Sequence, residues 1–398
     1  MEKRTSRTRS AFRLGPALAV GLGLLVAFPR WSEGALSEPP AVALGSLHVD
    51  PHGAVTAPVE GGGTATLTLD ASLEQAATRL LQDARAKTGA LVALDARTGK
   101  LLAWAGTHGA SVDHSVVAST FAPAASLFKL VTTAALLEKH VNPDREVCVS
   151  GGSSVLTEEH LVRPRGGNAL CAPFREALGR SRNAVFAQLA TRYLRPDDLV
   201  RVSSRLGFGG DASFDVPAAV GTLDVPDGKV PFARAAAGFV GSRLSAPGAA
   251  HLATTIATFG KVLHVQVVEH ADGYDAPRRR RFVGTALPEG TARELARMME
   301  VTIHSGTSRE VFTAPDGHSF LGDVRAAGKT GTLHGDAEDA TTSWFVGFAP
   351  ARAPRIVLAV LLENGETWRR KANEVGRDFL RVYFARRGAR GVTMPDGF

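Results

Sequence analysis

One short segment contains a serine at a spacing from a lysine that would suit nucleophilic catalysis. In Ser126-Leu127-Phe128-Lys129 the two side chains are three positions apart, and this is the only Ser-x-x-Lys in the chain. At the start of a helix, positions i and i+3 share a face, so the lysine amine can reach the serine hydroxyl. Serine needs a neighbouring base, and lysine can be that base only if burial or a positive charge lowers its pKa. A single such motif is expected about once by chance in a chain this long, so it indicates little alone.

A second motif, Ser181-Arg182-Asn183, stands where one expected helix gives way to another. The serine hydroxyl can relay a proton, because a hydroxyl both donates and accepts a hydrogen bond. The amide of Asn183 can hold a substrate carbonyl and the lysine amine. This motif is also weak evidence on its own.

The tripeptide Lys-Thr-Gly occurs twice, and its context separates the two copies. Residues 87–89 follow an expected amphipathic helix, where a basic residue and then a glycine are typical of a helix end, so we interpret this copy as structural. The second copy, Lys329-Thr330-Gly331, is followed by Thr332 in an expected strand. There the lysine adds positive potential, the hydroxyls can bind a carboxylate, and the glycine lets a substrate backbone approach.

The three motifs follow one another in the order known from penicillin-recognising serine enzymes. With them, the sequence resembles the transpeptidase domain of bacterial penicillin-binding proteins over about residues 64–386. The stretches that carry the resemblance include TLTLDASLEQAA, ALVALDARTGKLLAWAG, FAPAASLFKLVT, FREALGRSRN, SGTSREVF, AAGKTGT and SWFVGFAP.

Two lines of reasoning predict an α+β fold. Strand-like segments at both ends of the sequence flank a helical centre, which indicates one domain with an antiparallel sheet. The resemblance implies more: a five-stranded antiparallel sheet flanked on one side by the terminal helices, beside an all-helical subdomain. The active site would lie between these two parts.

The resemblance also implies a role for each motif. Ser126 would be the acylated nucleophile and Lys129 its proton acceptor, and the backbone N–H groups of Ser126 and Thr332 would form the oxyanion hole. Ser181 and Asn183 correspond to the second motif of the family. The wall that binds the substrate carboxylate would be formed by Lys329, Thr330, Gly331 and Thr332.

The activity implied is D,D-transpeptidation of peptidoglycan stem peptides that end in D-Ala-D-Ala, with β-lactams as covalent substrate mimics. Carboxypeptidase activity, a β-lactamase, and a non-catalytic β-lactam sensor or scaffold are the alternatives. One β-lactamase class needs a glutamate after the second motif, but here none follows Ser181 before Glu269. No cofactor is expected.

Two stretches depart from the common pattern of this family. Ala124-Ala125 precedes the nucleophile where Pro-Gly is commoner, and ATFGK stands where Ala-Asn-x-Gly is frequent. Neither departure removes a group that the chemistry needs. They affect the subtype more than the activity.

The N-terminal region predicts a single membrane anchor. Five basic residues and one acidic residue precede residue 14, and residues 14–29 carry no charge. We expect a cytoplasmic tail at 1–13, a membrane anchor or signal segment at 14–31, a flexible tether at 32–63, and the enzyme domain at 64–398. The domain would then be periplasmic, or secreted if the segment is cleaved, with a cell-wall synthesis complex as a partner. The rest of the chain is only mildly basic, which argues against a nucleic-acid partner.

The chain contains two cysteines, Cys148 and Cys171. Outside the cytoplasm they can form a disulfide, which would stabilise the fold by roughly 3 kcal/mol. Two separate buried thiols are the alternative. Without further cysteines or a histidine cluster, no metal site is expected.

Overall fold

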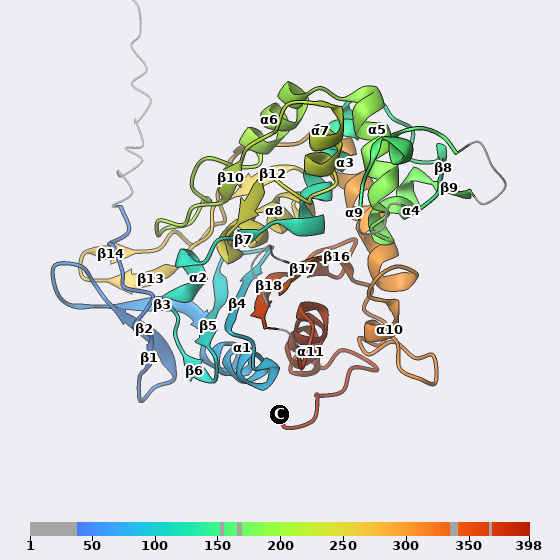
Figure 1. The fold of residues 1–398 in the computed structure, drawn as a ribbon. Coiled ribbons are helices and arrows are strands. Elements are labelled where there is room, and N and C mark those ends of the chain that lie inside the picture. The colour runs from blue at the N-terminus through green and yellow to red at the C-terminus, as the bar shows by residue number, and fades with distance from the viewer. Residues whose placement is uncertain (1–37, 152–154, 165–168, 335–340, 366–367) are drawn as a thin grey trace, which may run out of the picture. The chain divides into compact units, whose positions relative to one another are not determined.

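The centre of the computed structural model is a six-stranded antiparallel sheet with the strand order β16-β17-β18-β4-β5-β6 (Figure 1). The prediction of five strands misses β6, a two-residue edge strand that forms because the chain turns back at Gly109 and pairs with the end of β5. The strands are β4 (Thr88–Asp95), β5 (Leu101–His108), β6 (Ser111–Val112), β16 (Ala327–His334), β17 (Thr341–Ala349) and β18 (Ile356–Asn364).

The structure describes residues 38–151, 155–164, 169–334, 341–365 and 368–398. The predicted cytoplasmic tail and anchor segment, residues 1–31, lie outside the described residues. Within the described ranges, no helix is both long enough and apolar enough to cross a bilayer.

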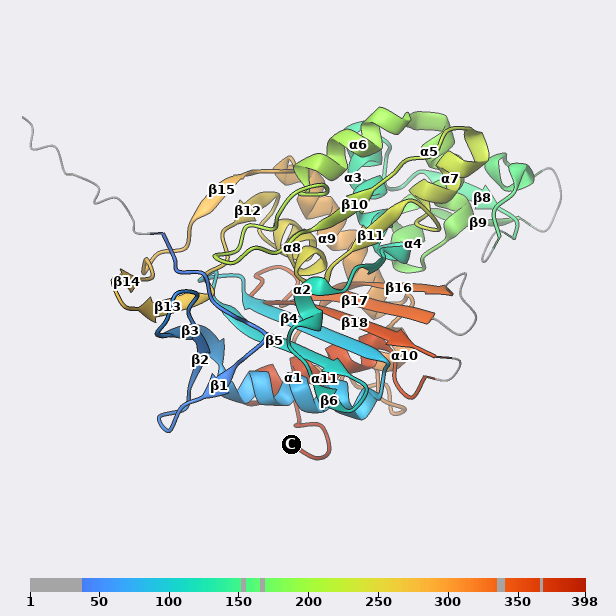
Figure 2. The same ribbon diagram turned by 60° about the vertical axis from the view of Figure 1, so that its left-hand side comes forward.

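The first and last helices, α1 (Ala71–Ala84) and α11 (Ala372–Ala385), pack side by side on one face of the central sheet, as predicted (Figure 2). Asp70 caps α1 as its position suggests, because its carboxylate accepts the N–H groups of Ser72 and Leu73.

The first Lys-Thr-Gly does not close α1. The helix ends earlier, with Arg85 in the left-handed conformation at φ 52°, and Thr88 and Gly89 already belong to β4. Gly89 pairs with Thr107 and Leu362 on the two neighbouring strands, so the sheet decides its conformation rather than the local helix-end signal. The copy is structural, but it begins a strand.

The other face of the sheet is covered by the helical part of the molecule, whose helix α8 packs directly on the strands (Figure 2). This part is not all-helical, since five short strands lie within it. Its helices are α3 (Lys129–Glu138), α4 (Phe174–Gly179), α5 (Asn183–Tyr193), α6 (Pro196–Arg205), α7 (Lys229–Ala236), α8 (Ala246–Ala257) and α9 (Glu289–His304). Its strands are β7 (Ala122–Pro123), β8 (Glu146–Val149), β9 (Leu170–Pro173), β10 (Gly221–Leu223) and β11 (Ser242–Leu244).

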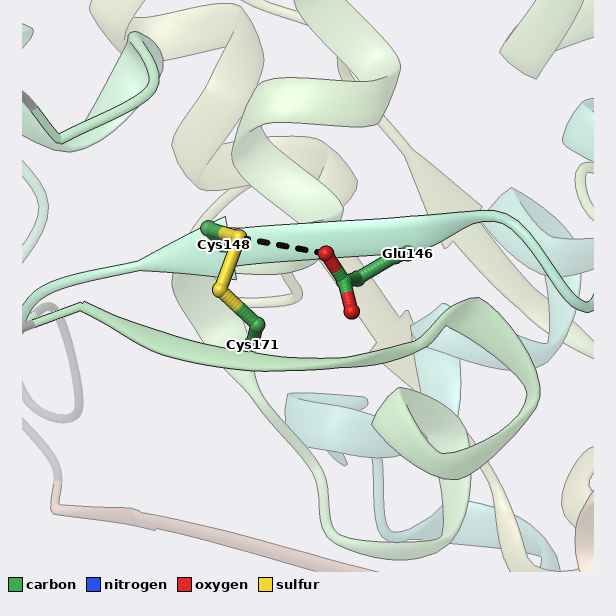
Figure 3. Close-up of side chains that lie close together, drawn as sticks. All are labelled: Glu146, Cys148 and Cys171. Carbon is green, nitrogen blue, oxygen red and sulfur yellow. Dashed lines mark hydrogen bonds between the residues drawn. A yellow bond between two sulfur atoms is a disulfide. The ribbon is translucent and has the colours of Figure 1, made fainter.

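A disulfide joins Cys148 on β8 to Cys171 on β9, where the two residues are directly opposite each other (Figure 3). The predicted disulfide is therefore present in the structure. The carboxylate of Glu146 lies 3.8 Å from the Cys148 sulfur. Because both sulfurs are bonded to each other, neither is a thiolate that could bind a metal with Glu146.

Of the tether predicted at 32–63, residues 32–37 lie outside the described residues, and residues 38–63 form strands rather than a segment with little structure. They contain β1 (His48–Val49) and β2 (Ala54–Pro58), and the chain then continues into β3 (Thr64–Asp70). β1 pairs with β2, and β2 pairs with β3. The prediction is wrong here because Val55 and Ala57 are buried in the core, and the glycines only form the turns between strands. The same sheet contains β13 (Val268–Ala271) and β14 (Tyr274–Asp275), whereas β12 (Lys261–Leu263) pairs with β15 (Phe282–Thr285).

Candidate active site

The Ser126–Lys129 motif forms the expected local pair. Ser126 lies in a short 3₁₀ helix, η1 (Ala125–Phe128), that runs directly into α3, and the Lys129 Nζ lies 2.7 Å from the Ser126 Oγ. The lysine is fully buried and also donates to the carbonyl of Ala237 at 2.6 Å. Burial, and then the charge of Lys329, hold the pKa of Lys129 well below its ordinary value. A neutral amine beside the hydroxyl is what proton abstraction requires.

The backbone before the nucleophile is held in an unusual conformation. Ala125 has φ 49°, a left-handed conformation that costs an alanine roughly 1 kcal/mol and that a glycine adopts freely. This is the position where the resemblance expects Gly. Gly238 contacts the Ala125 carbonyl so closely that a Cβ there would lie 2.0 Å from the oxygen, and the Trp344 indole donates to the Pro123 carbonyl.

The second motif meets the third across the gap between the helical part and the sheet. Ser181, at φ 53° between α4 and α5, accepts a hydrogen bond from the Lys329 Nζ at 3.1 Å. Lys329 also donates to the Thr330 carbonyl, and burial lowers the pKa of Lys329 to about 7. The three predicted motifs therefore supply two hydrogen-bonded pairs, Ser126 with Lys129 and Ser181 with Lys329, beside one another.

Side chains of β16 alternate between the two faces of the sheet. Lys329 points to Ser181, and a Cβ at Gly331 would lie 3.4 Å from the Ala124 carbonyl oxygen, so the glycine allows η1 to pack against the strand. Thr330 points the other way and shares a 2.7 Å hydrogen bond with Thr307.

These groups surround a cavity of about 290 Å³. Of the predicted residues, Ser126, Ser181, Asn183, Thr330 and Thr332 line it, whereas Lys129 and Lys329 are buried behind them and the disulfide is not part of it. Five lining residues have no counterpart in the sequence prediction: Thr307, Ser343, Trp344, Lys371 and Asn373.

Three of these additional residues had a signal in the sequence, because Ser343 and Trp344 begin the stretch SWFVGFAP that carries the family resemblance. Thr307 belongs to the Ser-Gly-Thr of the stretch SGTSREVF, and its loop is tied to α4 because its N–H donates to the Gly179 carbonyl. Lys371 and Asn373 come from the start of α11, far from any motif in the chain. Only the fold brings them to the cavity.

The comparison with known proteins gives the family of the chain. The family model "Penicillin binding protein transpeptidase domain" matches residues 89–381, which is well over half of the chain. The chain therefore belongs to this family and has its α+β transpeptidase fold.

Mycobacterial transpeptidases are among the similar proteins of known identity. The chain is 27% identical over 348 residues to the peptidoglycan D,D-transpeptidase PbpA of Mycolicibacterium smegmatis, covering 76% of this chain and 68% of the relative. The crystal structure of PBPA from Mycobacterium tuberculosis matches with a TM-score of 0.65 and 24% identity, over 82% of each chain. The ceftriaxone acyl-enzyme complex of that protein matches with a TM-score of 0.64 and 25% identity, over 80% of this chain and 79% of the other.

Proposed function

We propose that this protein is a serine D,D-transpeptidase that cross-links peptidoglycan stem peptides and is acylated by β-lactams. One observation carries the proposal: the hydroxyl of Ser126 faces the amine of a fully buried lysine at 2.7 Å, at the wall of a cavity. The hydroxyl of a serine is a weak nucleophile until a base removes its proton. A lysine with a lowered pKa can be that base, because its amine is neutral.

In the proposed acylation, the Ser126 Oγ attacks the carbonyl carbon of the penultimate D-Ala while its proton passes to the Lys129 Nζ. The oxyanion of the tetrahedral intermediate accepts the backbone N–H groups of Ser126 and Thr332, an interaction that contributes a few kcal/mol in sites of this kind. The C–N bond then breaks, and the departing D-Ala amine takes up the proton. Ser181, which lines the same cavity and accepts a hydrogen bond from Lys329, would relay it.

The second half-reaction resolves the ester. The amine of a second stem peptide attacks the acyl carbon, and Lys129 accepts the proton of the nucleophile. The ester bond to the Ser126 Oγ then breaks, which releases the cross-linked product, and the proton passes from Lys129 to the serine oxygen. Water in place of the amine gives carboxypeptidase activity. Asn183 lines the cavity, where its amide can orient the acyl group. A β-lactam would stop at the ester because its leaving amine stays attached.

We propose further that the apolar segment at 14–31 anchors the protein in the inner membrane with the enzyme domain on the periplasmic side, within reach of stem peptides and of a cell-wall synthesis complex. Support comes from the basic residues before the segment and from the oxidised cysteine pair, which suits a compartment outside the cytoplasm.

The test uses the full chain in mild detergent with a donor pentapeptide ending in D-Ala-D-Ala and an acceptor stem peptide that has a free side-chain amine. The expected result is release of D-Ala together with a cross-linked product, both lost in Ser126→Ala. Ser204→Ala, an exposed serine on α6, is the matched control and should retain both. Release of D-Ala without cross-linking would favour a carboxypeptidase, and no release by the folded protein would overturn the proposal.

A further inference from the structure

The lysine of the third motif is not available to a ligand in the cavity. The Lys329 side chain is fully buried, and its amine donates to Ser181 and to the Thr330 carbonyl. Lys329 is not one of the described residues that line the cavity. Both a D-Ala-D-Ala peptide and a penicillin carry a carboxylate, and a carboxylate is bound best by a cationic donor that it can touch. A cationic side chain that lines the cavity would add its charge to the hydroxyls of Thr330 and Thr332.

Lys371 is the one charged side chain among the described residues that line the cavity. It is exposed, and its ammonium lies 5.3 Å from the centre of the Trp368 ring. No salt bridge joins it to a described carboxylate, and the nearby Glu374 carboxylate accepts the backbone N–H of Lys371 instead. The neighbouring Arg370 is not an alternative, because it is paired with Asp378.

The sheet geometry explains how a residue of α11 reaches the same cavity as Ser126. On the antiparallel pair β16–β17, Thr332 is opposite Ser343, and opposite residues point to the same face. That face is the one on which α11 packs. The cavity therefore extends around the edge strand β16, from Ser126 on one face to the start of α11 on the other.

Hydrogen bonds fix the start of α11 at this place. The Ser343 Oγ accepts the N–H of Ala372 at 3.1 Å, and the Asn373 side chain donates to the Ser308 Oγ at 3.0 Å. The loop with Ser308 is bonded in turn to β16 through Thr307 and Thr330. Lys371 therefore stands on a backbone that is held against both strands.

We propose that Lys371 binds the carboxylate of the ligand: the C-terminal carboxylate of the donor peptide, and the equivalent ring carboxylate of a penicillin. The hydroxyls of Thr330 and Thr332 complete this subsite. The inference rests on the proposed acylation of Ser126 and adds to it the residue that recognises the charge of the substrate.

The test compares benzylpenicillin with its methyl ester, which lacks the negative charge but keeps the reactive lactam. Second-order acylation rates are measured by intact mass on the full chain in mild detergent. Lys371→Met should lower the rate with benzylpenicillin by about 10-fold and change the rate with the ester by less than about 2-fold. Lys371→Arg should restore most of the preference for the free acid. A thermal melt of each variant shows whether it is folded.

Lys261→Met is the matched control, because this lysine is also exposed and stacks on an aromatic ring, Phe282, but lies outside the cavity. It should leave both rates unchanged. If Lys371→Met changes the two rates equally, or changes neither while Ser126 is still acylated, the inference is overturned. If the unmodified protein reacts with neither compound, the proposed function itself fails.

Discussion

The charge of one buried lysine, Lys329, acts on another, Lys129. Lys129 and Lys329 are both inaccessible to solvent, and the positive charge of Lys329 adds to the effect of burial in lowering the pKa of Lys129. On this view Lys329 contributes by favouring the neutral, basic form of Lys129 and by holding the Ser181 hydroxyl, rather than by touching the substrate carboxylate.

Replacing Lys329 by methionine should therefore shift the pH dependence of acylation. Without the neighbouring charge the pKa of Lys129 rises, so a smaller fraction of Lys129 is neutral at about pH 7 and the acylation rate falls there by at least about 10-fold. Because raising the pH restores the neutral amine, part of the rate should return by about pH 9. The measurement is the pH profile of penicillin acylation, with Lys261→Met as control. An equal loss at every pH would mean that Lys329 acts only by positioning Ser181.

At the scale of elements, the end of α7 supports the nucleophile. The carbonyl of Ala237 accepts the Lys129 amine, and Gly238, at φ 82°, packs on the carbonyl of Ala125. Any side chain at 238 would have to push away the backbone next to Ser126, since a Cβ would lie 2.0 Å from the Ala125 oxygen.

Gly238→Ala should thus reduce penicillin acylation by about 100-fold, because a displacement near 1 Å at a reacting group has an effect of that order. Gly273→Ala is the matched control: its φ of 76° is similar, but a Cβ there meets nothing within 4 Å. The Gly273→Ala variant should be somewhat less stable than the unmodified protein, and its acylation rate should be unchanged. Equal rates for the two variants would contradict the supporting role of α7.

A second element-scale feature is the contact of α1 with the sheet through a buried carboxyl group. The Glu74 Oε2 accepts the backbone N–H of Trp104 on β5 at 2.7 Å, and its Oε1 has no hydrogen-bond partner in the described structure and lies 3.6 Å from the His114 Nδ1. Burial raises the pKa of Glu74 from 4.5 to about 7. The folded state therefore favours the protonated acid.

The pH dependence of stability follows from the sign of this shift. Below about pH 4.5 Glu74 is protonated in both the folded and the unfolded state, so it does not change the free energy of unfolding. Between about pH 4.5 and 7 the unfolded state loses this proton more readily than the folded state, so the free energy of unfolding falls as the pH rises. The total loss is at most about 3 kcal/mol. Glu74→Gln removes the charge and keeps an acceptor for Trp104. Denaturant unfolding at about pH 8 should find this variant more stable than the unmodified protein by about 1–3 kcal/mol, with a smaller difference at about pH 5. The exposed Glu310→Gln serves as control. A constant difference at all pH values would contradict the shift.

For the whole molecule, local sequence patterns predicted what depends on local structure. The pairing of Ser126 with Lys129 follows from helical spacing, and the cap at Asp70 follows from its place before an amphipathic helix. The family resemblance added the role of each motif and the expectation that the active site lies between the sheet and the helical part.

The remaining features depend on contacts between distant parts of the chain. The two-residue strand β6, the short strands at 48–49 and 54–58, and the hairpin at Cys148 and Cys171 exist because of their pairing partners. Lys371 reaches the cavity because the last helix returns to β17, which no pattern around residue 371 reveals. The periodicity of a sequence does not indicate which distant segments pack against each other.

The most direct test of the proposed chemistry is to incubate the full chain in mild detergent with benzylpenicillin and locate the adduct by intact mass and peptide mapping. A β-lactam adds its whole mass on ring opening, so a single increment on the peptide with Ser126, absent from Ser126→Ala, is the expected result. An adduct on another residue, or no adduct on a protein that melts cooperatively, would contradict the assignment of Ser126 as the nucleophile.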